Sequence, residues 1–281
     1  MKRIIAIDSS GNVDRFAGID TVSVPLKIVQ GSQEFVDDET LDCEAMLDDL
    51  DASHEKSSTS CPNVADWLSA FGDADEVFAV TISANLSGSF DAAFIAANQY
   101  QAAHEGRVVH VFNSFGTGPK MEMICDKIAE LVSLNKPFEH IVEMVESYAR
   151  SIQVLFSLES LSNLSKNGRV SPVVAKAAGL LGIRLIGHAS EEGTIEMVDK
   201  ARGEKKNLSA IVNNMLREGY FGGKVRISHT SNETAAKKLA EMLRVSFPDC
   251  DVAFRLNRGL CSYYSERGGL IIGFERAVPE A

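Results

Sequence analysis

The chain has 281 residues, 45% of them hydrophobic, and carries a formal net charge of −11. A chain of this length can bury the core of one large or two medium domains, and its apolar fraction excludes wholesale disorder. The acidic balance, without a basic stripe and interleaved aromatic residues, argues against nucleic-acid binding, and it leaves room only for transient contact with an anionic membrane.

The sequence favours a cytoplasmic protein without a metal or other cofactor. Its N-terminal apolar run is too short for a signal peptide, and no run approaches the roughly 18 apolar residues of a membrane-spanning helix. The five cysteines are widely separated and include no Cys-x-x-Cys pair, which is typical of unpaired thiols in a reducing compartment. The six histidines are scattered as well, so we expect no transition-metal site.

In the first half of the chain, apolar runs typical of strands alternate with helical patterns. The expected strands cover residues 3–7, 22–29, 77–82 and 108–112. The expected helices cover residues 64–71, 90–100, 121–134 and 138–148. Such alternation predicts a mostly parallel sheet with helices on its faces.

From about residue 152 the pattern changes to more numerous strands beside turn signals. The expected strands cover residues 153–157, 184–188, 194–198, 225–229, 252–256 and 270–275, with a hairpin turn at 191–193. The expected helices cover residues 173–181, 205–218 and 233–247. We therefore predict an α/β protein of two domains, a parallel-sheet α/β domain over 1–150 and a mixed-sheet α+β domain over 151–281. A cleft between two such domains is the default ligand site.

Two clusters of hydroxyl groups lie where a helix is expected to begin. Residues 83–89 (SANLSGS) follow the expected strand 77–82, and residues 57–63 (SSTSCPN) precede the expected helix 64–71. Hydroxyls and free N–H groups at the positive end of a helix suit a carboxylate or phosphate. The alternative is that Ser60 and Ser87 cap their helices, which serine often does.

Two further segments could supply polar groups to a ligand. The turn at Asn167 and Gly168 places Arg169 on a tight loop, where its guanidinium can reach an anion or orient another donor, or simply face solvent. Tyr263 and Tyr264 lie in an expected loop, where they could line a pocket, with one phenol as donor, or pack against each other.

The common catalytic patterns are missing. The sequence has no Gly-x-Ser-x-Gly elbow, and residues 219–224 (GYFGGK) have the wrong spacing for a P-loop. Residues 116–119 (GTGP) lack the third glycine of a dinucleotide fingerprint and predict the start of a helix. The sequence thus offers hydrogen-bond donors without an activated nucleophile.

In chain order, these motifs resemble the DegV family, which includes the fatty-acid-binding (FakB) subunits of bacterial fatty acid kinase. The resemblance covers almost the whole chain. Its most specific motif is 82–89 (ISANLSGS), similar to Ile-Ser-Ser-x-Leu-Ser-Gly-Thr in the family. The other matching segments are 7–10 (IDSS), 59–63 (TSCPN), 113–114 (NS), 161–170 (LSNLSKNGRV) and 200–203 (KARG).

The resemblance implies a non-catalytic carrier that encloses one long-chain fatty acid and presents it to a separate ATP-dependent fatty acid kinase. The carboxylate would be held between the domains, and the acyl chain would lie in an apolar tunnel. The implied carboxylate ligands are Thr59, Ser87, Gly88, Arg169 and Tyr264. The implied supporting residues are Ser60, Ser83, Ser89, Asn113 and Ser114.

The chain departs from the family pattern at three positions of this implied site. Tyr264 stands where the family usually has a histidine, Cys61 where it has a glutamine, and Asn167 where it has the first glycine of Gly-Gly-Arg. A tyrosine can donate a hydrogen bond but cannot become cationic near neutral pH. Two other functions remain open, a serine-dependent acyl hydrolase that uses Ser87 and a sensor of phosphate or another small anion.

Overall fold

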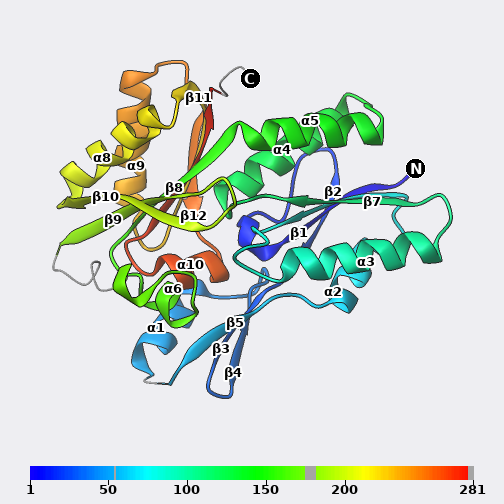
Figure 1. Cartoon of the computed structure of the whole chain (residues 1–281), viewed down its shortest axis with the longest axis horizontal. Coiled ribbons are helices and arrows are strands. Elements are labelled where there is room, and N and C mark those ends of the chain that lie inside the picture. Colours follow the sequence, from blue (N-terminus) through cyan, green and yellow to red (C-terminus); the bar gives the residue numbers. More distant parts are fainter. Residues whose placement is uncertain (54, 175–181, 278–281) are drawn as a thin grey trace.

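The computed structural model describes residues 1–53, 55–174 and 182–277, which form three sheets and the helices around them (Figure 1). The first sheet has the strand order β2-β1-β6-β7, and all of its strands are parallel. These strands are β1 Arg3–Asp8, β2 Asp20–Val24, β6 Glu76–Thr81 and β7 Val108–Asn113. The expected parallel sheet is therefore confirmed.

Helices cover both faces of this sheet, so its central strands are buried on both sides. Ile4 of β1 belongs to a core cluster with Trp67, whereas the next residue, Ile5, belongs to another cluster with Met121. Successive side chains of a strand point to opposite faces, which explains this division. The helices concerned are α2 Val64–Phe71 and α3 Ser89–Ala103 on one face, and α4 Pro119–Ser133 and α5 Phe138–Arg150 on the other.

The second sheet is mixed, as expected, with the strand order β10-β9-β8-β13-β11-β12. Only β11 and β12 are parallel neighbours in it. Its strands are β8 Ile152–Leu158, β9 Ile183–Ala189, β10 Ile195–Arg202, β11 Tyr220–His229, β12 Val252–Leu256 and β13 Leu270–Arg276. Helices α8 Glu204–Arg217 and α9 Glu233–Ser246 pack on this sheet. All of its strands lie after residue 150, and the division into two domains there stays a prediction.

Helix α4 joins the two large sheets. It contacts β6 of the first sheet and β8, β11 and β13 of the second. Gly273 of β13 permits this approach, because an added Cβ would lie only 2.9 Å from the Cβ of Pro119. The start of α4 is therefore held at the junction of the two sheets.

A small antiparallel sheet with the order β4-β3-β5 lies below this junction in Figure 1. Its strands are β3 Lys27–Gln30, β4 Gln33–Val36 and β5 Ser57–Ser60. Three short helices and a 3₁₀ turn complete this region: η1 Ser9–Gly11, α1 Cys43–Ala52, α6 Ser162–Lys166 and α10 Gly259–Ser265.

Three local expectations are wrong, and one lies outside the described residues. The expected strand 22–29 is two strands of different sheets, because Pro25 has no N–H to donate to a ladder. Residues 57–60 form β5, and Asn63 rather than Ser60 caps α2. The tyrosine pair lies in α10 and not in a loop. The expected helix 173–181 falls mostly on residues 175–181, outside the described ranges.

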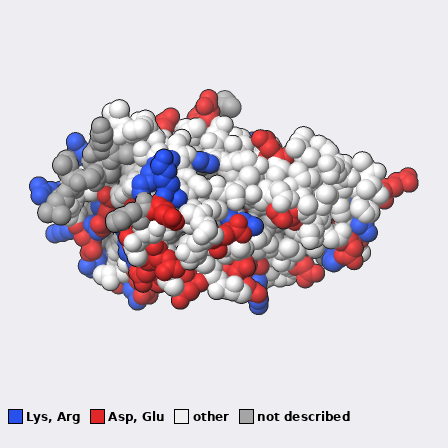
Figure 2. All heavy atoms as spheres, turned by 90° about the horizontal axis from the view of Figure 1, so that it is seen from below, with Lys and Arg blue, Asp and Glu red and all other residues white. Residues whose placement is uncertain are grey.

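The described residues include no helix that is both long and apolar enough to cross a membrane. The face shown in Figure 2 carries acidic and basic side chains close together, beside a broad area without charge. No continuous basic stripe crosses this face.

Candidate functional site

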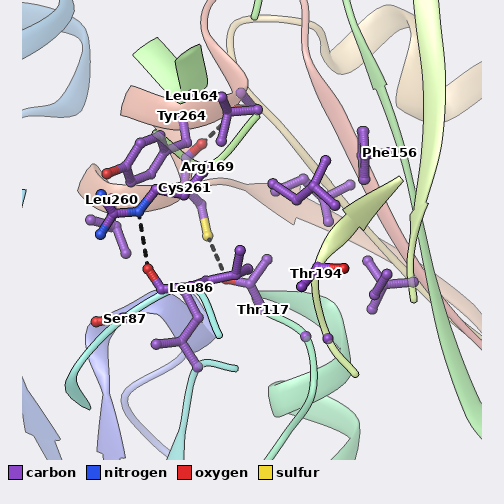
Figure 3. Close-up of a pocket in the computed structure, with 18 of the residues that line it drawn as sticks. Leu86, Ser87, Thr117, Phe156, Leu164, Arg169, Thr194, Leu260, Cys261 and Tyr264 are labelled. Atoms are coloured by element: carbon purple, nitrogen blue, oxygen red, sulfur yellow. Dashed lines mark hydrogen bonds between the residues drawn. The ribbon is translucent and has the colours of Figure 1, made fainter. Parts of the chain in front are cut away.

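A cavity of about 90 Å³ lies where the three sheets and α10 meet (Figure 3). Most of its lining is apolar and comes from both large sheets and the segments that follow their strands. The apolar residues are Leu26, Ile82, Leu86, Val154, Phe156, Leu158, Leu164, Ala189, Ile195, Leu260 and Ile271. Such a lining suits a hydrocarbon chain.

Four of the five expected carboxylate ligands line this cavity. They are Thr59, Ser87, Arg169 and Tyr264, which come from segments far apart in the sequence. In Figure 3, Ser87, Arg169 and Tyr264 lie at one side of the cavity, whereas Phe156 and Thr194 lie at the other. The cavity therefore has one end rich in hydrogen-bond donors. The binding role of these side chains stays a prediction.

Ser87 lies in the loop between β6 and α3, one residue before the N-cap of the helix. The backbone N–H groups of Leu86 and Ser87 both donate to the carbonyl oxygen of Ser83, at 2.9 and 3.2 Å. The Ser87 hydroxyl accepts a bond from the N–H of Ser89 at 3.3 Å. Its own proton has no acceptor in the described part of the chain, so it is available to a ligand.

Gly88 does not line the cavity and is exposed. It is the N-cap of α3 and makes no side-chain cap. A Cβ added there would lie 3.3 Å from the sulfur of Cys61, so the start of α3 lies close to the end of β5. Gly88 therefore leaves room for the Cys61 side chain at the start of α3, and it supplies no hydroxyl or guanidinium donor.

A buried carboxylate, Asp8, holds the Ser87 loop in place. Its Oδ2 accepts the Ser89 hydroxyl at 2.7 Å and the Ile82 N–H at 2.9 Å, and its Oδ1 accepts the Ser10 N–H at 3.2 Å. Burial raises the pKa of Asp8, and the hydrogen bonds from Ser10, Ser89 and Ile82 oppose that rise. Asp8, from the segment 7–10, thus positions the loop through these hydrogen bonds and does not itself line the cavity.

Arg169 links two of the loops at the polar end. It follows the turn at Gly168, whose φ of +75° favours glycine. Its Nε donates to the carbonyl oxygen of Leu86 at 3.1 Å, and its Nη1 donates to the carbonyl oxygen of Asn167. The guanidinium therefore orients the loop that carries the Ser87 hydroxyl, because Leu86 directly precedes Ser87.

Tyr264 comes from α10, whose first turn is fixed by a distant carboxylate. Asp37 is fully buried and accepts the N–H groups of Gly259 and Leu260 at 2.7 and 2.9 Å. The Tyr264 phenol lies 2.7 Å from the Thr59 hydroxyl. Burial raises the pKa of Tyr264, whereas the Thr59 hydrogen bond and the positive charge of Arg169 lower it. The phenol is consequently a neutral donor near pH 7.

None of the five expected supporting residues lines the cavity. Ser60 is exposed, and Ser83 is buried. Asn113 accepts the N–H groups of Ala84 and Phe115, and the Ser114 hydroxyl donates to the carbonyl oxygen of Gly116 at 3.0 Å. Together with Ser89, these side chains shape the loops around the cavity.

Sequence reasoning missed four polar residues of the lining, Thr117, Thr194, Cys261 and Ser265. Thr117 lies 3.5 Å from the Cys261 sulfur, and burial raises the pKa of this thiol to about 12. The only signal for Thr117 was its place between Gly116 and Gly118, which predicts a helix start equally well. Across the described ranges, no three His, Cys, Asp or Glu side chains form a group that could hold a metal ion.

A family model described as the uncharacterised DegV protein family matches residues 4–273. The chain belongs to the DegV family. A DegV domain-containing protein of Streptococcus pneumoniae is 39% identical over 254 residues, which are 90% of each chain. The expected family and fold are therefore confirmed.

Solved structures similar to this chain contain fatty acids. A DegV family protein of Eubacterium eligens loaded with heptadecanoic acid is 41% identical, with a TM-score of 0.96 over 98% of this chain and all of that one. The Streptococcus pneumoniae Fatty Acid Kinase (Fak) B3 protein loaded with linoleic acid is 37% identical, with a TM-score of 0.96 over 99% of this chain and 100% of that one.

Proposed function

We propose that this DegV protein binds one long-chain fatty acid and presents its carboxylate to a separate ATP-dependent fatty acid kinase. The observation that carries the proposal is a single cavity with an apolar lining and hydroxyl and guanidinium donors at one end. The fatty acids in two relatives with TM-scores of 0.96 support the same ligand class. The chain would take its ligand up by transient contact with a membrane and act in the cytoplasm.

The acyl chain would supply most of the affinity. Burial of hydrocarbon contributes about 0.8 kcal/mol per CH₂ group, so a long chain outweighs any single hydrogen bond at the polar end. The donors would then fix which end of the ligand faces the partner. A free phosphate or other small anion would leave the apolar lining unused, which makes the small-anion alternative unattractive.

The polar end is suited to hold a carboxylate and not to attack one. Burial raises the pKa of both Cys261 and Tyr264, so neither is an activated nucleophile near neutral pH. The Ser87 hydroxyl accepts only the Ser89 N–H and has no general base beside it in the described residues. We therefore assign phosphoryl transfer to the partner, in which the carboxylate oxygen bonds the γ-phosphorus of ATP and ADP leaves.

Native mass spectrometry of the gently purified protein tests ligand binding directly. We expect a complex with one long-chain fatty acid, identified by extraction of the denatured protein. A protein that carries only phosphate, or no ligand even after incubation with oleic acid, would contradict the proposal. Kinase presentation is tested with ATP and a bacterial fatty acid kinase subunit, by trapping the acyl phosphate with hydroxylamine. Hydroxamate should form only when both proteins are present.

A further inference from the structure

Tyr263, the neighbour of Tyr264, is completely buried and does not line the cavity. Its phenol nevertheless has two hydrogen-bond partners on different elements. It lies 2.7 Å from the Ser57 hydroxyl of β5 and accepts a bond of 2.9 Å from the Asn167 side-chain amide. Because the amide nitrogen is the donor, the phenol proton is free to go to Ser57.

This contact runs beside the one between Thr59 and Tyr264. Ser57 and Thr59 are two residues apart on β5, so their side chains lie on the same face of the strand. The rings of Tyr263 and Tyr264 pack edge to face with centroids 4.9 Å apart. Two hydroxyl pairs therefore join β5 to α10, and the buried pair restricts how the pair at the cavity can move.

Asn167 extends the same network to Arg169. The backbone carbonyl oxygen of Asn167 accepts a hydrogen bond from the Arg169 guanidinium. The side-chain amide of Asn167 also donates to the backbone carbonyl oxygen of Asn163 at 2.9 Å. Asn163 in turn donates to the backbone carbonyl of Tyr263 at 2.8 Å. Helix α6 and the turn before Arg169 are thus hydrogen-bonded to α10 at two atoms of Tyr263, its phenol oxygen and its backbone carbonyl oxygen.

One path of contacts connects Thr59, Tyr264 and Arg169 and ends beside Ser87. From the hydrogen-bonded pair of Thr59 and Tyr264 it passes by ring packing to Tyr263, and then by hydrogen bonds to Asn167 and Arg169. From Arg169 it reaches the carbonyl oxygen of Leu86, beside Ser87. Buried networks of this kind fix geometry when every member is satisfied, and they lose it when one member is removed.

We propose that Tyr263 and Asn167 are positioning residues for carboxylate recognition. They touch no ligand and act by holding Thr59, Tyr264 and Arg169 at a fixed spacing. This inference rests on the proposed fatty acid binding. The positioning role also accounts for the asparagine at position 167, because a glycine has no side-chain amide to donate a hydrogen bond to the Tyr263 phenol.

The test compares Tyr263→Phe, Asn167→Ala and the double variant for binding of oleic acid and of methyl oleate. Each single variant should weaken oleic acid binding about three- to ten-fold, and methyl oleate binding should stay unchanged because the ester lacks the charged head group. The double variant should be no weaker than the worse single one, because both act through the same bond.

Ser58→Ala is the matched control, since Ser58 is exposed on the opposite face of β5. Equal losses for acid and ester would show a merely structural role and overturn the inference, as would fully additive losses. If Tyr263→Phe does not fold, Ser57→Ala removes the acceptor of the same phenol and must weaken acid binding selectively. A wild-type protein that binds neither ligand would refute the proposed function instead, and the positioning role with it.

Discussion

The Tyr264 phenol and the Thr59 hydroxyl lie 2.7 Å apart across 205 residues of sequence. Each hydroxyl has a single proton, so one group donates to the other and only one proton remains for a ligand. The pair therefore acts as one donor to a carboxylate, and its second member orients and polarises the first. Ser87 and Arg169 supply the remaining donors at this end of the cavity.

Removal of either hydroxyl should weaken fatty acid binding by about 1–3 kcal/mol, because the other is left without its partner. Thr59→Val and Tyr264→Phe make these changes with little loss of volume. In the double variant the loss should be smaller than the sum of the two, since both changes break the same contact. Titration calorimetry with oleic acid measures all four proteins. Strictly additive losses would mean that the two hydroxyls bind the ligand independently.

Ser87→Ala should also weaken fatty acid binding by about 1–3 kcal/mol, because a buried carboxylate loses a donor. The free energy of unfolding should change little, since the Ser87 hydroxyl accepts only one long bond of 3.3 Å from Ser89. Ser69→Ala, at an exposed position of α2, is the control and should bind as the wild type does. Unchanged affinity in Ser87→Ala would remove this residue from the site.

Ser87→Ala also distinguishes a fatty acid carrier from an acyl hydrolase. A serine-dependent acyl hydrolase would react with a fluorophosphonate probe at Ser87, and Ser87→Ala would abolish the labelling. We expect no labelling of either protein. A labelled wild type whose signal disappears in the variant would favour the hydrolase instead.

The architecture was predictable because the strongest sequence patterns lie in elements with buried faces. Strand β6 is an apolar run buried along its whole length, α3 buries a stripe that includes Ala93, Ala97 and Tyr100, and the hydroxyl cluster between them marks the polar end of the cavity. In contrast, α10 has only seven residues and begins at a glycine. Asp37, 222 residues before Gly259, caps its first turn, and no local pattern could reveal this contact.

Part of the candidate site was also predictable from the sequence. Family motifs indicated Thr59, Ser87, Arg169 and Tyr264, which all line the cavity. Neighbours in those motifs, such as Ser60 and Gly88, were expected as ligands or supports but do not face it. In a strand alternate residues face opposite sides, so the unexpected β5 separates Thr59 from Ser60.

Arg169 should not be replaceable by lysine. A lysine keeps the positive charge but lacks the planar fork whose separate nitrogens, Nε and Nη1, donate to the carbonyl oxygens of Leu86 and Asn167. We expect Arg169→Lys to lose most of the affinity that Arg169→Met loses. Lys166→Met removes an exposed charge from the preceding helix and should have little effect, since exposed charges are screened. Full binding by Arg169→Lys would show that charge alone matters there.

Tyr264→His should make fatty acid binding depend on pH. Burial raises the pKa of Tyr264 above its ordinary value of about 10, so the wild-type phenol is neutral between about pH 5 and 8. An imidazole titrates near pH 6.5 and is cationic below its pKa, where it attracts a carboxylate. The affinity of the variant relative to the wild type should therefore rise as the pH falls from about 8 to 5. The ratio of the two dissociation constants cancels the titration of the fatty acid itself. A ratio that is constant over this pH range would place the side chain at position 264 away from the carboxylate.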